Sequence, residues 1–212
     1  MVCGDDQCGV GEDQCNCAQD CATGCAGCCG ESMCHTGDTP DHCGTAGLTC
    51  ASCADGKTCK EGQCKASLTW TDPATDLTWQ HPPAGVTIGW AEAKTYCSDL
   101  GLAGYEDWRL PTIDEQRALI RGCPATEPSG SCNISEGGCT AWSCHSAGCD
   151  DGCPAFGGPA NGCYLPDGLK GSCGMSWSST GVADFGTSVW LVQFHIAKVA
   201  GVSGITDVRC VR

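Results

Sequence analysis

The chain has 212 residues, of which 24 are Cys and 31 are Gly, and its formal net charge is −14. A cysteine content above one tenth is typical of exported, disulfide-built proteins and argues against an ordinary cytosolic enzyme. No basic stripe is present that would bind nucleic acid, and no stretch approaches the roughly 20 apolar residues of a membrane span. We therefore expect a secreted or cell-surface protein, although the sequence shows no signal peptide.

Residues 1–65 hold fourteen cysteines and almost no aliphatic side chains, so covalent links must replace a hydrophobic core. We expect a disulfide-stapled module lacking regular structure apart from one short hairpin, and it could consist of two subunits, 3–34 and 34–64. The hairpin is predicted by "CADGKTCKEGQC", which places Cys59 opposite Cys64. Whether these two cysteines pair with each other or with other strands stays open.

The start of this module alternates cysteines with glycines and acids. Hard oxygen ligands on tight turns suit calcium, but the spacing of these carboxylates does not match a known calcium loop. Solvated acids on a small scaffold are therefore the favoured interpretation, and calcium stays the only cofactor candidate. The weak candidate ligands are Asp5, Asp6, Glu12, Asp13 and Asp20.

The composition changes abruptly at Lys65, and a second domain is expected over residues 66–212. All seven tryptophans and enough aliphatic residues for one ordinary core lie there. Residues 69–71 and 77–80 predict a hairpin around the turn "DPATD", in which Asp76 tolerates a positive φ.

Two helices are predicted next. The first starts near Gly89, buries a face that includes Cys97, and ends at Gly101. The second starts at a capping box formed by Thr112 and Glu115 and runs to about Arg121. Its buried side is expected to include Ile113 and Ile120.

A long cysteine-rich insertion follows over residues 123–173. It contains eight cysteines and no sustained period, and it is too long for an ordinary connection, so we expect disulfide staples. Beyond it, alternation over 189–196 predicts a strand with one strongly apolar face. The chain then closes on a last short strand that carries Cys210.

The insertion carries aromatic, acidic and imidazole side chains with no evident role in a core. Aromatic rings stack on sugars or peptide side chains, and carboxylates accept hydroxyl or cationic groups. An equally good alternative is that Trp142 and Tyr164 fill a small core beneath the loop. The candidate ligand-binding residues are Trp142, His145, Asp150, Asp151, Tyr164 and Asp167.

Metal and catalytic patterns are weak elsewhere. Cys25–Cys28 and Cys50–Cys53 have the spacing of zinc ligands, but no matching histidine pair follows them. Neither pair opens a helix after a strand, as a redox motif would. The sequence has no G-x-S-x-G elbow, and His195 is better explained as an edge residue than as a general base. We expect no firm metal site and no enzyme.

Six motifs occur in order: "WTDPATDLTWQ", "WAEAKTYCSDL", "DWRLPTIDEQRALI", "SWSST", a W-x-V-x-F strand and "VRCVR". With them, residues 68–212, apart from the cysteine-rich insertion, resemble the Lcl C-terminal-like domain family of bacterial surface proteins, and residues 3–64 resemble the cysteine-rich modules that precede such domains. The resemblance implies an α+β, C-type-lectin-like fold with two helices, a small twisted antiparallel sheet and a long loop region that carries ligand contacts. It also implies a Cys97–Cys210 disulfide, with the other eight cysteines paired within 123–173.

The Glu-Pro-Asn and Trp-Asn-Asp motifs by which sugar-binding C-type lectins hold calcium are absent, so calcium-dependent sugar binding is not implied. Relatives are associated with adhesion to glycans, including acidic ones, but the net charge of −14 argues against a polyanionic ligand. We therefore expect an adhesion or ligand-binding protein whose partner is an extracellular glycan or protein. Two alternatives stay open: a homo-oligomeric subunit of a surface layer or filament, and an oxidase of the formylglycine-generating type.

Overall fold

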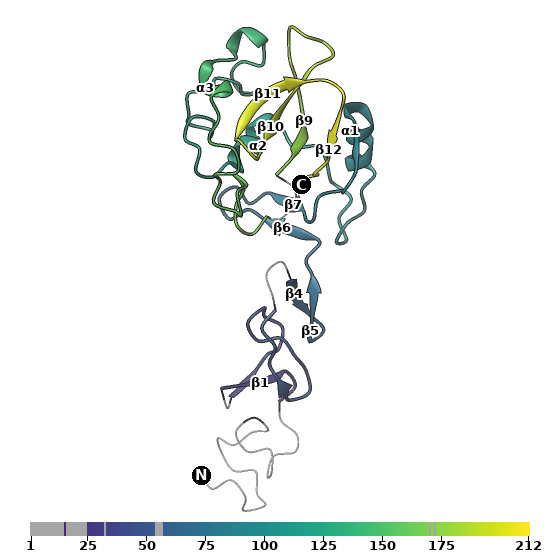
Figure 1. Ribbon diagram of the computed structural model, residues 1–212. Helices are drawn as coiled ribbons and strands as arrows, with labels where there is room; N and C mark the ends of the chain where they lie inside the picture. The colour runs from purple at the N-terminus through teal and green to yellow at the C-terminus, as the bar shows by residue number, and fades with distance from the viewer. Residues whose placement is uncertain (1–14, 16–24, 32, 54–56, 170, 172) are drawn as a thin grey trace, which may run out of the picture. The chain divides into compact units, whose positions relative to one another are not determined.

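Short strands dominate the structure, a computed structural model that describes residues 15, 25–31, 33–53, 57–169, 171 and 173–212 (Figure 1). The chain divides into two units, Met1–Ser67 and Leu68–Arg212, so the boundary lies two residues after the expected one. The strands are β1 (Cys28–Gly30), β2 (Met33–His35), β3 (Leu48–Thr49), β4 (Lys57–Lys60), β5 (Gln63–Ala66), β6 (Thr69–Thr71), β7 (Thr78–Gln80), β8 (Thr87–Gly89), β9 (Met175–Gly181), β10 (Val189–Gln193), β11 (Lys198–Val202) and β12 (Ile205–Asp207). The helices are α1 (Trp90–Ser98), α2 (Ile113–Ala118), the 3-10 helix η1 (Trp142–Cys144) and α3 (Ala147–Asp150).

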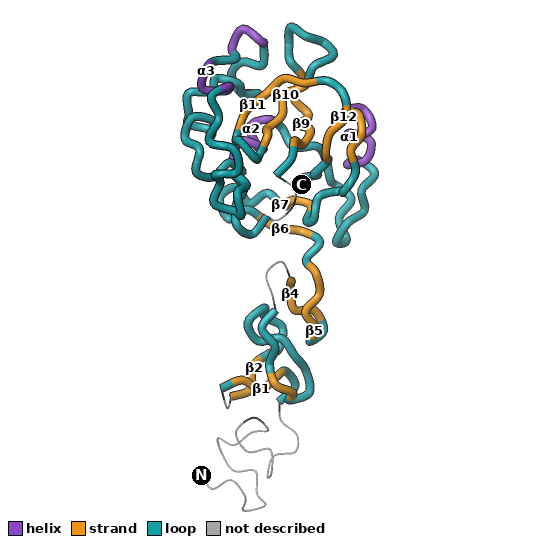
Figure 2. Tube along the Cα trace, viewed as in Figure 1, coloured by secondary structure: helices purple, strands orange, loops and turns teal. Residues whose placement is uncertain are grey.

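The described residues of the N-terminal unit form two small sheets, which corrects the expectation of a module with only one hairpin. Strand β1 pairs antiparallel with β2 and parallel with β3, while β4 and β5 form the predicted hairpin (Figure 2). Cys59 faces Cys64 across that hairpin, but the two are not bonded to each other. Cys59 pairs with Cys43, and Cys64 pairs with Cys53.

Disulfides take the place of a hydrophobic core in this unit. The buried apolar side chains among its described residues are all cysteines, namely Cys25, Cys28 and Cys43. The Cys28–Cys50 bridge and the β1–β3 pairing join residues on either side of position 34. The described parts of the two suggested subunits, 3–34 and 34–64, are therefore tied together.

The C-terminal unit is built on a five-stranded sheet in the order β11-β10-β9-β12-β8. Side chains from opposite faces of β10 enter two different cores. Leu191 packs with Cys97 of α1, while Trp190 and Val192 pack with Ile113 of α2 and with the stapled insertion. Because both faces are covered, β10 is apolar on both sides.

The strand prediction over 189–196 was therefore wrong in two respects. Leu191, expected on the less apolar face, is fully buried, and β10 ends at Gln193. His195 lies half-buried in the turn that follows, which is an edge position. The expected last strand is also shorter, since β12 ends at Asp207 and Cys210 lies beyond it.

The two ends of the C-terminal unit meet beside the β6–β7 hairpin. Its turn places Asp76 at φ 59°, the left-handed conformation expected there. The N–H of Thr78 donates to the carbonyl of Arg212 at 3.0 Å, and the N–H of Arg212 donates back at 2.9 Å. Cys97 in α1 is bonded to Cys210, the pair that the resemblance implies. The first helix is thus linked covalently to the end of the chain.

Helix α2 is short and unusually polar on its inner side. It begins with the predicted capping box and ends at Ala118, three residues earlier than expected. Ile113 and Ile120 are buried as predicted, but so is Gln116, which apolar periodicity could not mark. The Gln116 amide donates to carbonyls of β9 and accepts the N–H of Val192 at 3.1 Å, so it connects β9 to β10.

The capping carboxylate makes the stability of this helix depend on pH. Burial raises the pKa of Glu115, but hydrogen bonds from Arg109 and Thr112 together outweigh burial and lower the pKa. A carboxyl with a lowered folded pKa stabilises the fold above its unfolded pKa, and this contribution is lost as the pH falls through the folded value. Glu115→Gln should therefore lower the urea midpoint at pH 7, with a difference from wild type that shrinks as the pH falls below about 4.5.

Tryptophan fluorescence suits this measurement, because all seven tryptophans lie in the C-terminal unit. The exposed Asp151, replaced by Asn, controls for the loss of one negative charge. A difference between Glu115→Gln and wild type that stayed constant down to pH 2 would contradict the assignment.

Candidate functional site

The insertion is held by four disulfides and lies beside β11, where α3 can be seen in Figure 1. All eight of its cysteines pair with one another, and the insertion contains the short helices η1 and α3. Such closely spaced links restrict the loop to few conformations without a core of its own. The bridges are Cys123–Cys153, Cys132–Cys149, Cys139–Cys144 and Cys163–Cys173.

Trp142 is a large, partly exposed side chain of this loop. It lies inside the small ring closed by Cys139–Cys144, and 44% of its surface is exposed. Its ring stacks on Trp190 and on His145, with centroids 5.5 and 5.1 Å away, and Phe185 meets it edge-on at 5.9 Å. We call these four residues the aromatic cluster. It holds Trp142 against the buried ring of Trp190, while Phe185 is itself exposed.

A glycine in β11 allows Trp142 to lie flat. Gly201 stands opposite Trp190 in the β10–β11 ladder, and a Cβ at this position would come within 2.7 Å of Cζ3 of Trp142. The loop is fixed on either side of the ring. The Trp190 indole donates to the carbonyl of Thr140 at 2.8 Å, and the N–H of Trp142 donates to Asp184 at 2.6 Å.

A charged group borders the aromatic cluster. His145 places Nε2 3.2 Å from the carbonyl of Val199 and Nδ1 3.2 Å from the carboxylate of Asp150. Both partners are hydrogen-bond acceptors, so the imidazole is held between β11 and α3. Lys198 lies 2.6 Å from Asp150, and its hydrogen bond is the main cause of the lowered pKa of that carboxyl.

The structure thus brings three of the six candidate residues together, namely Trp142, His145 and Asp150. Tyr164 is a correction: only 2% of it is exposed, and its hydroxyl donates to the carbonyl of Pro154 within the core. For this residue, the alternative of a core beneath the loop was the right one.

The other two candidate residues, Asp151 and Asp167, do not join the aromatic cluster. Asp151 is exposed just after α3, and Asp167 lines a separate cavity of about 290 Å³ together with Asn161 and Leu169. Sequence reasoning missed Phe185, Trp190 and Lys198. The one local signal was an exposed aromatic residue, Phe185, in the Gly-containing turn "ADFGT".

Carboxylates and cysteine sulfurs are the two kinds of candidate metal ligand in the chain. The calcium candidates Asp5, Asp6, Glu12, Asp13 and Asp20 lie outside the described residues. Within the part that is described, two groups of three sulfur atoms each lie within 4.8 Å of one another. These groups are Cys15, Cys25 and Cys34, and Cys43, Cys53 and Cys64.

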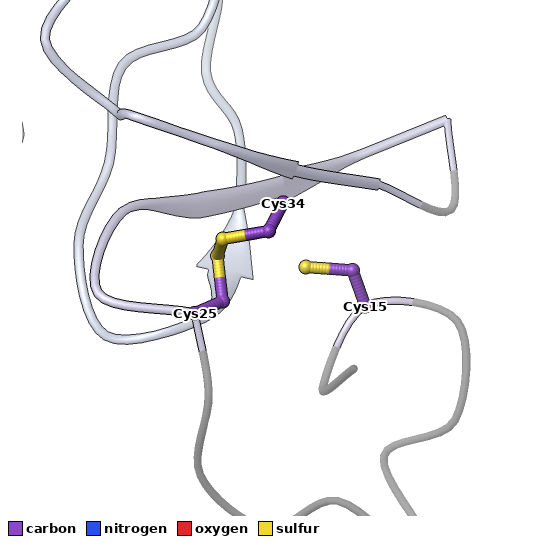
Figure 3. A group of neighbouring side chains, drawn as sticks. All are labelled: Cys15, Cys25 and Cys34. Carbon is purple, nitrogen blue, oxygen red and sulfur yellow. A yellow bond between two sulfur atoms is a disulfide. The ribbon is translucent and has the colours of Figure 1, made fainter. Parts of the chain in front are cut away.

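Disulfide bonding decides the chemistry of both sulfur groups. Figure 3 shows Cys25 bonded to Cys34, with the sulfur of Cys15 pointing toward that bond. Cys15 is itself bonded to Cys29. Metals bind the thiolate, and a disulfide sulfur is not one, so neither group offers a thiolate ligand in this form.

The whole C-terminal unit is similar to a known family. A family model described as Lcl C-terminal domain matches residues 68–212. No curated protein and no solved structure matches the chain. Across the residues that the structure describes, no helix has the length and apolar character needed to cross a membrane.

Proposed function

The chain belongs to the Lcl C-terminal domain family, and on this basis we propose that it is a non-enzymatic adhesion or ligand-binding protein. Membership indicates a surface or secreted protein, and the many disulfides fit an extracellular location. We further infer a C-type-lectin-like fold. Two observations support it: the bridge from α1 to Cys210, and the pairing of Trp79 with Val211 near the chain end.

The observation that carries the proposal is the half-exposed indole of Trp142 on a rigid support. Aromatic residues supply contact area with few rotatable bonds, so little conformational entropy is lost when a ligand stacks on them. Here the stacking on Trp190 and the Cys139–Cys144 ring already restrict the side chain. A sugar ring or an apolar peptide side chain can therefore bind without ordering the loop first.

We propose that binding needs neither catalysis nor calcium. The carboxylate next to the aromatic cluster, Asp150, is already paired with Lys198 and His145. The alternative oxidase would need a reactive cysteine pair, whereas all ten cysteines of Leu68–Arg212 lie in disulfides. These features favour a binding surface.

The test begins with a glycan and protein array probed with the whole chain, with calcium and with a chelator. For a ligand found in this way, Trp142→Ala should weaken binding tenfold or more, since truncating a central aromatic residue at an interface costs about 2 kcal/mol. The chelator should leave the affinity unchanged. Tyr105→Ala is the matched control, because Tyr105 is also 44% exposed but packs on Arg212 away from the aromatic cluster.

Gly201→Ala provides a second variant that keeps the indole. Its Cβ would push Trp142 off the sheet, so binding should weaken while the urea midpoint changes little. Full affinity in both Trp142→Ala and Gly201→Ala would overturn the proposal. Elution as large assemblies, with ligand binding unaffected by either variant, would instead support a layer or filament subunit.

A further inference from the structure

The insertion carries a second aromatic side chain that is even more exposed than Trp142. Phe156 is 66% exposed, and its ring centroid lies 5.6 Å from that of His195. Its backbone has φ 56°, the left-handed region that bulky residues avoid at a cost of about 1–3 kcal/mol. A hydrogen bond from its N–H to the carbonyl of His195, at 2.7 Å, holds it in place. The loop thus maintains a strained conformation that turns a phenyl ring toward solvent.

Phe156 and the aromatic cluster belong to one continuous edge of the molecule. Strand β11 is the outermost strand of its sheet, and residues 142–156 run alongside it and the preceding turn in the opposite direction. Successive contacts fix this order: Trp142 over Gly201, His145 at Val199, Asp150 at Lys198, Cys153 at Ile196 and Phe156 at His195. A strand rises about 3.3 Å per residue, so β11 alone separates Gly201 from Lys198 by about 10 Å, and the Phe156–His195 pair lies beyond Lys198 in the preceding turn.

We propose that the aromatic cluster and the Phe156–His195 pair form the two ends of one extended surface that binds a neutral polysaccharide chain. This inference rests on the proposed function of Trp142 and identifies the class of its ligand. Two aromatic platforms suit a chain of rings, because each platform stacks on a different sugar unit. Between them, the half-exposed carboxylate of Asp150 can accept hydrogen bonds from hydroxyl groups.

Charge favours a neutral chain over an anionic one. Lys198, the cation between the two platforms, is already paired with Asp150 at 2.6 Å. Residues 66–212 carry fifteen acids against eight Lys and Arg, so the unit as a whole repels polyanions.

The backbone favours a sugar chain over an extended peptide. A peptide binds a sheet edge by adding a strand, which requires free N–H and C=O groups on that edge. Here the loop already occupies three carbonyls along β11 and its preceding turn, those of Val199, Ile196 and His195. Strand addition is therefore blocked along the length that joins the two platforms.

The experiment measures affinity against chain length for four neutral series, the cello-, N-acetylchito-, manno- and malto-oligosaccharides, from dimer to hexamer. In at least one series, wild-type affinity should rise tenfold or more with length. Phe156→Ala should abolish that rise and leave dimer affinity unchanged, whereas Phe156→Tyr should retain the rise. Ile205→Ala, which removes an apolar side chain 69% exposed on β12, is the matched control.

Other outcomes would contradict one of the two proposals or both. If hexamers bind no tighter than dimers, or if Phe156→Ala keeps the full length dependence, the extended surface is wrong, while a Trp142-dependent ligand would preserve the proposed function. If no neutral series binds but the array gives a Trp142-dependent protein ligand, the polysaccharide assignment fails alone. If Trp142→Ala binds everything as wild type does, both proposals fail.

Discussion

Replacing Cys97 and Cys210 together by alanine should lower the free energy of unfolding of the C-terminal unit by about 4–5 kcal/mol. Their disulfide closes a loop with a sequence separation of 113, and the loss of chain entropy in the unfolded state grows with loop length. Both side chains are fully buried in the core that contains α1 and Leu191. The bridge therefore links helix, sheet and chain end.

The Cys139→Ala/Cys144→Ala double variant is the matched control. It also removes one disulfide, but the sequence separation is only 5, for which the same relation gives about 2 kcal/mol. Urea unfolding followed by tryptophan fluorescence compares the two variants in the whole chain. Equal losses of stability would show that loop closure does not explain the contribution of Cys97–Cys210. The control should also weaken ligand binding, because it releases Trp142.

Arg117→Met should cost about 3–5 kcal/mol, the second large effect on stability. The Arg117 guanidinium is buried, and it donates to the carbonyls of Thr126, Glu127 and Ile134 in the insertion. Burial lowers the pKa of Arg117, and the charge of Asp114 partly offsets that. Methionine fills much of the volume but leaves three carbonyls without this donor.

Two further variants test whether the several N–H donors of the Arg117 guanidinium are needed for stability. Arg117→Lys retains the charge but offers a single point donor, so it should recover only part of the lost stability. Arg212→Met removes an arginine whose partner, Asp107, is exposed, and it should cost much less than Arg117→Met. Amide hydrogen exchange should show faster opening of residues 123–135 in Arg117→Met. Full recovery of stability in Arg117→Lys would contradict the role assigned to the guanidinium donors.

Local physics made several elements of the fold predictable. The turn at Asp76, the inward face of α1 and the capping box at Thr112 each depend on residues within four or five positions of one another. Strand β10 was misjudged because its second apolar face is covered by α1, which lies about 100 residues earlier. Likewise, the pairing of Cys59 with Cys43 depends on where another loop passes, and the alternation of the hairpin cannot specify it.

The candidate site likewise has a part that the sequence predicted and a part that depends on the fold. Trp142, His145 and Asp150 lie within nine residues, so one short stretch marked them. Their partners Trp190 and Lys198 come from β10 and β11, and only the folded sheet brings them to the loop. Tyr164 was misassigned because exposure of an aromatic ring within a stapled loop depends on which side the core lies.

The covering of β11 by residues 142–156 also bears on aggregation. An uncovered edge strand offers backbone groups to the edge of another molecule, and natural sheets protect such edges with charges, short strands or loops. At this edge His145 bonds to the carbonyl of Val199 in β11, and the N–H groups of Cys153 and Phe156 are bonded to the turn before it. The opposite edge strand, β8, has only three residues. Substitutions that release this segment would therefore expose β11 to pairing with another molecule, whereas Trp142, whose indole does not bond to those carbonyls, is freer to change as ligands change.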